Sequence, residues 1–354
     1  MNIRRSPTAS MISERAGVSK STVSRALKGH PSIPKSTRDR VLAIARELGY
    51  EPNAMARSLV TLRSGVIGYV IGEIENPFYQ EHLERLTKIT AERDMQLMLF
   101  QVARDGDLAD VVPSMARYRL EGCIVIASVP TSREAIDACA RYSIPVVLLN
   151  RVVRDGAASS VLCNSRAGAQ EIARFLVEGG HQRIAFLRGR PGSVVSEDRE
   201  LGFREGLAAA GAPLFAEQTG HFRFEAAYQA AVELLRRTPR PDAIFAASDL
   251  MAFGVLDAMR DLGLKAPDDV SVVGFDDIRA ASWPAYRLTT FAQPAAAMLE
   301  RAVDLLAARA GAVDRPPESI FISGALRVRR SARLPASYRE EGRETSGDIA
   351  AALP

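Results

Sequence analysis

The stretch that decides the fold of the N-terminal region is Ile12–Leu27, ISERAGVSKSTVSRAL. It predicts two short helices joined by a tight turn at Gly17, because glycine adopts left-handed backbone angles at little cost. Ser19 is placed to cap the second helix, and Val23 and Leu27 lie four residues apart on a face that packs inward. The opposite face carries small hydroxyl and cationic side chains: Lys20, Ser21, Thr22, Ser24 and Arg25. Such donors suit phosphates and base edges, so the segment is typical of a helix that reads DNA.

The charge of the chain is concentrated at the same end. Residues 1–63 contain 12 Lys and Arg against 4 Asp and Glu, a net charge of +8, whereas the whole chain carries +4 and residues 64–354 therefore carry −4. A local excess of positive charge attracts a polyanion through counterion release. Charge alone fits a solvated basic face equally well, but the helix-turn-helix spacing on the same segment favours DNA.

Two further helical segments follow this motif. Ser36 with Asp39 resembles a capping box, and the helix that it starts is predicted to end near Gly49. Apolar residues repeat along it at helical spacing: Val41, Ile44 and Leu48. Asn53 then caps a predicted short helix, Ala54–Val60. A helix of this length is marginal alone, so we expect it to form against a second copy or on DNA; composition by itself also fits a plain linker.

These segments resemble the lactose-repressor (LacI-type) family of bacterial transcription regulators. The resemblance rests on Gly17–Arg25, Thr37-Arg38 and Pro52–Leu59, and it continues to about residue 334. It implies base contacts in the major groove from Lys20, Ser21 and Arg25, and phosphate contacts from Ser19, Thr22 and Ser24. It also implies a DNA-binding hinge that contains Asn53, Arg57 and Leu59, with Leu59 inserted into the minor groove beside the same leucine of a second subunit. Met11 and Ser13 depart from the family's usual Asp and Ala, with little effect expected on the fold.

The remaining length, about 270 residues, is enough for two α/β lobes. Short apolar runs alternate with helical patterns, which is typical of parallel sheets covered by helices on both faces. The predicted strands form two series, namely Val66–Ile71, Leu97–Val102, Gly122–Ile126 and Val146–Leu149, then Arg183–Leu187, Ala243–Ala246 and Val270–Gly274. We therefore expect two doubly wound lobes, similar to a periplasmic binding protein, with a ligand cleft where the carboxyl ends of their strands meet.

The predicted domain boundaries follow from these patterns. Residues 1–52 form the all-α helix-turn-helix headpiece, 53–64 the hinge helix and linker, and 65–334 the two-lobed effector-binding and dimerisation domain. Residues 335–354, rich in Glu, Arg, Ser and Ala, lack heptad leucines and are predicted to be a disordered tail.

Polar residues follow several predicted strands and are candidates for the cleft: Asn76, Asn150, Arg151, Ser248, Asp249, Asp276 and Asp277. Asp276 and Arg199 suit a polyhydroxylated ligand, because a carboxylate accepts from two hydroxyls and a guanidinium donates to two oxygens. Aromatic side chains suit the apolar face of a sugar or a planar ring: Phe78, Tyr79 and Phe222. Alternative roles stay open, with Asp249 and Asp277 as backbone caps, Phe78 and Phe222 as core, and Arg151 as an ion-pair partner.

The family resemblance narrows the effector site. It places the gripping pair at Arg199 and Asp276 and the variable lining at Phe78, Tyr79, Phe222, Ser248 and Gln293, and strand-end position adds Arg151. Asn164-Ser165 stands where the family usually has Asp-Asn, near the predicted crossover between lobes, and the missing charge favours a less cationic or more anionic ligand. Tyr286 replaces a frequent Pro, and Leu288–Thr290 is predicted to mark a return crossing.

Several function classes are excluded or disfavoured. No apolar run reaches the ~18 residues of a membrane span, and Met1–Arg5 lacks a secretory pattern, so we expect a cytoplasmic protein. Neither the three cysteines nor the four histidines show ligand spacing, and no P-loop or Gly-x-Ser-x-Gly motif occurs, so we expect no metal, no cofactor and no enzyme.

The resulting hypothesis is a homodimeric repressor on a pseudo-palindromic double-stranded DNA operator, controlled by a sugar or sugar acid in the cleft. Two alternatives stay open from the residues. One is a DNA-binding regulator whose lobes respond to a protein partner or a corepressor. The other is a small-molecule binding protein that does not act on DNA.

Overall fold

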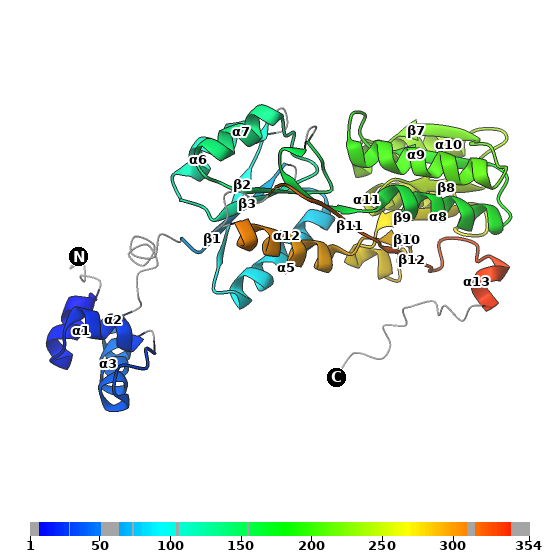
Figure 1. Ribbon diagram of the computed structural model, residues 1–354. Helices are drawn as coiled ribbons and strands as arrows, with labels where there is room; N and C mark the ends of the chain where they lie inside the picture. The colour runs from blue at the N-terminus through cyan, green and yellow to red at the C-terminus, as the bar shows by residue number, and fades with distance from the viewer. Residues whose placement is uncertain are drawn as a thin grey trace, which may run out of the picture. The chain divides into compact units, whose positions relative to one another are not determined.

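The computed structural model describes residues 7–27, 29–50, 64–72, 74–103, 106–153, 156–309 and 316–340. The chain divides into two compact units, Met1–Ser64 and Gly65–Pro354 (Figure 1). The predicted hinge residues Asn53, Arg57 and Leu59 lie outside the described residues, and so does most of the predicted tail, residues 341–354.

The described residues of the first unit form three helices, α1 (Ala9–Ala16), α2 (Lys20–Leu27) and α3 (Lys35–Leu48), around one small core of mostly aliphatic side chains: Ile12, Ala16, Val23, Ala26, Ile33, Val41 and Ala45. The predicted turn is confirmed, because Gly17 has φ 64° and ends α1. The Ser19 hydroxyl caps α2 by accepting from the N–H of Thr22 at 3.1 Å. Ser13, the departure noted above, donates its hydroxyl to the carbonyl of Val18 at 2.6 Å and so fastens the turn.

The predicted capping box at the start of α3 is wrong. The N-cap is Pro34, whose side chain makes no capping hydrogen bond, and its carbonyl accepts from the N–H of Arg38 at 3.0 Å. Ser36 therefore lies inside the first turn of α3 instead of before it. Gly49 ends this helix with φ 64°, as predicted.

The second unit consists of two lobes, each with a six-stranded sheet. The first sheet is parallel throughout, with order β11-β5-β4-β3-β1-β2, where β1 is Val66–Ile71, β2 Gln96–Gln101, β3 Gly122–Ile126, β4 Val146–Leu149, β5 Ser159–Cys163 and β11 Ser319–Ile322. The second has order β12-β10-β9-β8-β6-β7, where β6 is Ile184–Arg188, β7 Ala216–Thr219, β8 Ala243–Ala246, β9 Ser271–Asp276, β10 Thr289–Ala292 and β12 Ala325–Arg327. In the second sheet only the pairing of β10 with β12 is antiparallel.

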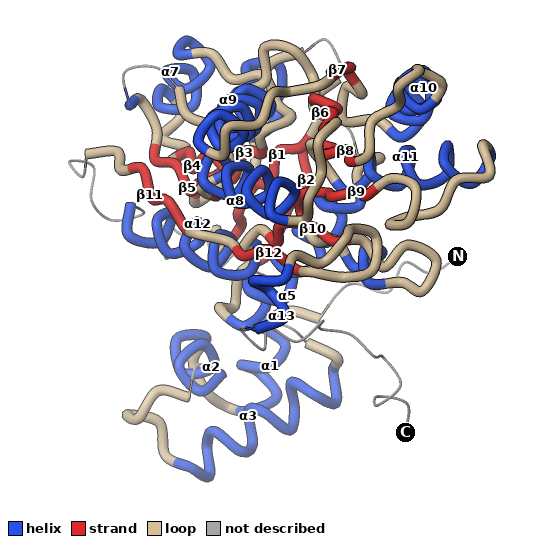
Figure 2. Tube along the Cα trace, turned by 90° about the vertical axis from the view of Figure 1, so that its right-hand side faces the viewer, coloured by secondary structure: helices blue, strands red, loops and turns tan. Residues whose placement is uncertain are grey.

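Helices cover both faces of each sheet (Figures 1 and 2). In the first lobe α5 (Pro77–Glu92) packs against α12 (Ala295–Arg309), and the short η1 (Leu108–Val111) and α6 (Val112–Ala116) pack with α7 (Arg133–Arg141). In the second lobe α8 (Ser165–Glu178) packs against α9 (Val194–Ala209), and α10 (Phe224–Leu235) against α11 (Asp249–Asp261). A single-turn η3 (Arg279–Ser282) follows β9. The predicted α/β class with two doubly wound lobes is confirmed.

The chain passes between the lobes three times: after β5, after β10, and between β11 and β12. The first crossing lies at Asn164-Ser165, as predicted, where the Asn164 side chain caps α8. The return crossing follows Ala292, so Leu288–Thr290 precedes it instead of marking it. All seven predicted strands are present, and β9 extends two residues beyond the predicted end to include Asp276.

The segment predicted to be disordered begins with a helix, α13 (Ala336–Glu340). Its Tyr338 is buried, and its ring makes an edge contact with Phe175 of α8 at a centroid distance of 5.1 Å. The prediction of disorder is therefore wrong for residues 336–340, because one aromatic side chain anchors this turn to the second lobe.

Candidate functional site

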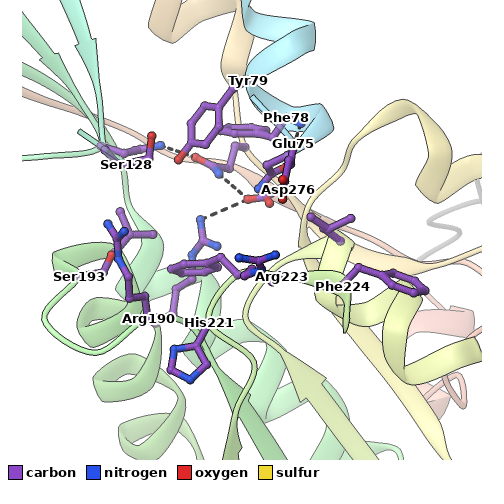
Figure 3. A pocket seen from close by; sticks show the side chains of 18 of the residues that line it. Glu75, Phe78, Tyr79, Ser128, Arg190, Ser193, His221, Arg223, Phe224 and Asp276 are labelled. Carbon is purple, nitrogen blue, oxygen red and sulfur yellow. Dashed lines mark hydrogen bonds and ion pairs between the residues drawn. The ribbon is translucent and has the colours of Figure 1, made fainter. Parts of the chain in front are cut away.

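A cavity of about 300 Å³ lies between the two lobes, at the carboxyl ends of their strands (Figure 3). The first lobe contributes the start of α5 with Phe78 and Tyr79, Ser128 after β3, and Asn150 after β4. The second lobe contributes Arg199 on α9, Phe222 after β7, Asp276 at the end of β9 and Gln293 after β10, among others. This volume and position are those of a small-molecule site in an open α/β fold.

A chain of hydrogen bonds runs through the back of the cavity. Arg199 donates from Nη2 to Oδ1 of Asp276 at 3.3 Å, and the same oxygen accepts from the amide of Gln293 at 2.7 Å. The Gln293 carbonyl accepts from the Asn150 amide at 2.7 Å, and the Asn150 carbonyl accepts from the N–H of Cys163 at 2.8 Å. The network therefore joins the gripping pair of the second lobe to the strand ends of the first.

Arg199 is fixed from several sides. It is 2% exposed, its guanidinium carbon lies 3.8 Å from the centroid of the Phe275 ring, and its Nη1 donates to the carbonyl of Ala247. Its Nε is buried with no hydrogen-bond partner among the described residues. A buried donor without an acceptor is costly, so Arg199 keeps hydrogen-bonding capacity that the described residues leave unused.

Burial changes the ionisation of two residues here. It raises the pKa of Asp276 to about 6, although the neighbouring Arg199 lowers it. Burial, with a further contribution from the charge of Asp276, raises the pKa of Tyr79 to about 12. At pH 7 the site therefore offers one ionised carboxylate and one neutral phenol, which suits a ligand rich in hydroxyl groups.

The backbone around the cavity is strained. Asn150, His221, Phe222 and Asp276 have φ values of 52°, 56°, 59° and 131°, in a region that side chains other than glycine's rarely adopt. Strain of this kind clusters at ligand sites, where the surrounding structure holds it in place. Gly189, directly after β6, leaves room for the Phe222 ring: a Cβ there would lie 2.1 Å from a ring carbon of Phe222.

Six of the eight predicted effector residues line the cavity: Phe78, Tyr79, Arg199, Phe222, Asp276 and Gln293. Arg151 and Ser248 do not. Ser248 is buried and caps α11 by accepting from the N–H of Met251, and Arg151 lies beside the cavity, where burial and the charge of Arg190 lower its pKa. Asp249 follows the alternative of a backbone cap, because it accepts from the N–H of Ile278 at 2.9 Å. Asp277 does not line this cavity and caps no backbone group among the described residues; it pairs with the Arg329 side chain at 2.7 Å.

Sequence reasoning missed several lining residues: Ser128, Arg190, Ser193, His221, Arg223 and Phe224. Arg190 and Ser193 follow β6, so the strand-end rule would have found them had it been applied to that strand. His221, Arg223 and Phe224 lie in the loop between β7 and α10, and the polar sequence of β7 gave no strand signal.

The predicted DNA-reading face of the first unit is exposed. Lys20, Ser21, Ser24 and Arg25 are exposed on α2, opposite the buried Val23 and Ala26. Hydroxyl groups gather at the start of this helix, where Ser19 lies 2.8 Å from Ser21 and 2.9 Å from Thr22 between oxygens. Within the described part of the chain neither Lys20 nor Arg25 forms an ion pair, so both cations face solvent.

Membrane spans and metal sites are the other two features that composition raised. No helix there is long and apolar enough to cross a membrane. The same part of the chain has no group of His, Cys, Asp and Glu arranged to hold a metal ion, and Cys123, Cys139 and Cys163 are buried and free.

Comparisons with known proteins agree with both units. The model of "Bacterial regulatory proteins, lacI family" matches residues 12–53, and that of "Periplasmic binding protein-like domain" matches residues 173–332. The probable HTH-type transcriptional repressor ExuR of Bacillus subtilis (strain 168) is 32% identical over 289 residues, which are 80% of this chain and 85% of that protein.

Two solved structures are similar over most of the chain. The lac repressor dimer bound to operator and the anti-inducer ONPF has a TM-score of 0.81 and 26% identity, covering 92% of this chain and 99% of that one. The complex of the transcriptional regulator CelR with cellobiose has a TM-score of 0.69 and 30% identity, covering 92% of this chain and all of that one (100%).

A helix-turn-helix unit followed by a two-lobed body of periplasmic-binding-protein type defines a class of DNA-binding transcription regulators, not of enzymes. Within that class, the chain belongs to the lacI family of bacterial regulatory proteins. The predicted resemblance is therefore confirmed. The alternative of a solute-binding protein that does not act on DNA is wrong, because the family headpiece is present.

Proposed function

We propose that this protein is a homodimeric repressor whose operator affinity is set by a sugar or sugar acid bound between the lobes. The headpiece residues Ser19, Lys20, Ser21, Thr22, Ser24 and Arg25 are proposed to bind DNA, with Asn53, Arg57 and Leu59 in the hinge. Two headpieces on two half-sites account for a pseudo-palindromic operator. Similarity to an operator-bound repressor dimer and to a regulator–cellobiose complex supports both parts of the proposal.

The observation that carries the proposal is the buried pair of Arg199 and Asp276 in a cavity lined by both lobes. A ligand that binds this pair and also touches Tyr79 or Asn150 contacts both lobes at once. Such a ligand favours one angle between the lobes over others, because its contacts are complete only there. By linkage, a change in DNA affinity caused by ligand equals the change in ligand affinity caused by DNA.

The experiment begins with footprinting on the DNA that flanks the protein's own gene, which identifies an operator. Operator affinity is then measured by fluorescence anisotropy, with and without single sugars and sugar acids at millimolar concentration. We expect at least one of them to weaken operator binding by about 10-fold or more, since coupling energies of this kind are typically 1–3 kcal/mol. An operator that no sugar or sugar acid affects, but that a protein partner releases, would contradict the effector part of the proposal.

A further inference from the structure

The N-terminus of α9 forms one end of the effector cavity and is equipped for an anion. Ser193, the N-cap residue, lines the cavity together with Val195, and Arg190 lies three residues earlier on the same loop. The first-turn N–H groups of a helix have no acceptor inside the helix, and the helix dipole makes this end positive. Phosphate and carboxylate groups bind such ends directly.

A second observation shows that the side chain at this end has no capping partner in the part of the chain that the structure describes. The Ser193 side chain is a usual capping group but makes no capping hydrogen bond, and the residue is only 9% exposed. Arg199, two turns further along, keeps a buried Nε without a partner among the described residues, and it also lines the cavity. Glu197, the carboxylate of the first turn, is exposed and does not line the cavity.

The described lining of the cavity has as many arginines as carboxylates, three of each, but the unpaired positive charge of Arg190 lies near the start of α9. Of the three lining arginines, Arg199 is paired with Asp276, whereas Arg190 and Arg223 have no carboxylate within ion-pair distance in the described part of the chain. The other lining carboxylates, Glu75 and Glu225, are exposed at the rim. Arg190 also acts on Arg151 of the first lobe as a like charge that lowers the pKa of Arg151. An anion placed beside Arg190 relieves this repulsion.

The polar groups for hydroxyls and the groups for an anion lie in different parts of the cavity. Figure 3 shows Arg190 and Ser193 together on the left of the cavity, whereas Asp276 lies nearer the centre, beside Phe78. A ligand that spans both parts therefore meets a carboxylate in one and cations with a helix terminus in the other. A neutral sugar leaves the second part without a charge partner, and a ligand with an anionic group in each part places one of them against the carboxylate of Asp276.

We infer that the effector is an acidic sugar whose single anionic group binds Arg190 and Ser193 at the start of α9, while its hydroxyls bind Asp276 and Arg199. This inference rests on the proposed function and specifies the ligand class of the same cavity. A carboxylate or a phosphate ester supplies the required charge, and the two are distinguished by experiment.

The test is isothermal titration calorimetry on the full chain without DNA. The probes are D-glucuronate and D-galacturonate, D-glucose 6-phosphate, and the matching neutral hexoses D-glucose and D-galactose. We expect at least one acidic sugar to bind about 10-fold or more tightly than its neutral counterpart, since a charge-assisted hydrogen bond contributes that much. A uronate in this role identifies the carboxylate, and the 6-phosphate identifies the phosphate ester.

Variants then locate the anionic group. Arg190→Gln is expected to weaken the acidic sugar by about 10- to 100-fold and to leave binding of the neutral hexose within about twofold. Ser193→Ala is expected to weaken binding of the acidic sugar by a smaller factor, again without changing binding of the neutral hexose. The matched control is Arg204→Gln, which removes an arginine from the outward face of the same helix, where it pairs with Glu200 and Glu217. Thermal melting confirms that each variant is folded.

Three outcomes would overturn the inference: neutral hexoses that bind as tightly as the acids, an Arg190→Gln variant that weakens both equally, or no binding by any of these sugars. The proposed function is tested separately by operator release. A neutral sugar that binds and releases operator contradicts the acidic-sugar inference and leaves the repressor standing, whereas an operator that no sugar or sugar acid releases contradicts the proposed function itself.

Discussion

Asn150 and Gln293 lie 143 positions apart in the chain, and their side-chain amides are joined by a hydrogen bond of 2.7 Å. Asn150 follows β4 in the first lobe, and Gln293 lies where the chain leaves the second lobe after β10. Gln293 also donates to Asp276, so its amide has a fixed orientation, with the carbonyl toward Asn150 and the NH₂ group toward the carboxylate. The angle between the lobes and the charge state of the effector site are therefore connected through one amide.

Asn150→Asp is predicted to break this connection. Both neighbours of the Gln293 amide, the substituted side chain at position 150 and Asp276, are then carboxylates. Whichever way the amide is turned, its carbonyl oxygen faces a carboxylate oxygen and loses its hydrogen bond. We expect the free energy of unfolding to fall by about 1–3 kcal/mol, the usual cost of an unmet buried hydrogen bond, and the effect of ligand on operator affinity to shrink. Denaturant unfolding and operator titration measure the two.

The control for this prediction is Asn164→Asp at the other crossover. It adds the same charge, but Asp caps a helix as well as Asn does, and Asn164 accepts from the N–H of Ala167 at the start of α8. We expect its free energy of unfolding to equal that of the original chain. Equal losses of unfolding free energy in the two variants would show that negative charge near the crossovers, and not the amide link, is responsible.

Arg199→Ala is predicted to abolish the effector response and to spare operator binding. Asp276 loses its buried partner, which costs about 3–5 kcal/mol for a broken buried pair, and the ligand loses its guanidinium. The headpiece is a separate unit, so operator affinity without ligand stays unchanged if the variant is folded. Anisotropy with and without effector measures this, and Arg204→Ala on the same helix is the control. A normal response in Arg199→Ala would mean that the effector binds elsewhere.

Gly189→Ala is predicted to narrow the cavity indirectly, by displacing the Phe222 ring that lines it. The new Cβ would lie 2.1 Å from the Phe222 ring, which must therefore move. We expect weaker effector binding with operator affinity unchanged. The double variant Gly189→Ala with Phe222→Leu restores space, so its affinity is expected to exceed that of Gly189→Ala and to equal that of Phe222→Leu alone. Isothermal titration calorimetry measures the effector affinity of the three variants. If the losses of affinity in the two single variants add up in the double variant, the steric argument is contradicted.

A residue of this site could be predicted where the sequence around it already shows a strand end or a helix start. Arg199 and Asp276 were found because charged residues at strand ends and helix starts have few structural explanations, and the strands were visible as apolar runs. The contact of Gly189 with Phe222 was not predictable, because it depends on the path of a loop after β7, a strand with the sequence AEQT and no apolar pattern.

The same reasoning explains the errors in the fold. β11 and β12 are short and largely exposed, so they lack the continuous apolar pattern of a buried strand. The helix α13 lies in a polar tail, and it is anchored by the buried Tyr338 against Phe175 and by a hydrogen bond of 2.8 Å from Ser337 to Glu178, contacts between residues far apart in sequence. At α3, the predicted capping box is wrong because Pro34 is the N-cap, two residues earlier than the predicted cap Ser36.

His82→Leu is predicted to remove an acid sensitivity of the first lobe. Burial, aided by the charge of Arg85, lowers the pKa of His82 to about 3, whereas the unfolded chain protonates it near 6.5. Between these values the unfolded state binds more protons, so stability is present above pH 6.5 and is lost as pH falls. The expected loss is about 2 kcal/mol between pH 7 and pH 5.

Chemical unfolding at pH 7, 6 and 5 measures this slope in both proteins. The variant is expected to lose about 2 kcal/mol less than the original chain over that range. His221→Asn is the control, because His221 is exposed and Asn tolerates its left-handed backbone. Equal slopes in the original chain and His82→Leu would show that another group sets the acid sensitivity.

Arg25→Ala is predicted to reduce discrimination between DNA sequences more than it reduces affinity for DNA in general. Arg25 is exposed on α2, on the face proposed to enter the major groove, and a guanidinium that donates to one base pair is worth about 1–3 kcal/mol of discrimination. We expect a loss of that size on the cognate operator, relaxed preference at one base pair, and a much smaller loss on random duplex. Arg15→Ala removes the same charge from α1, where Arg15 pairs with Glu47 at 2.6 Å, and should lower affinity for both duplexes slightly and equally. If Arg25→Ala also weakens both duplexes equally, Arg25 acts on the phosphates and the base-reading role belongs to Lys20 and Ser21.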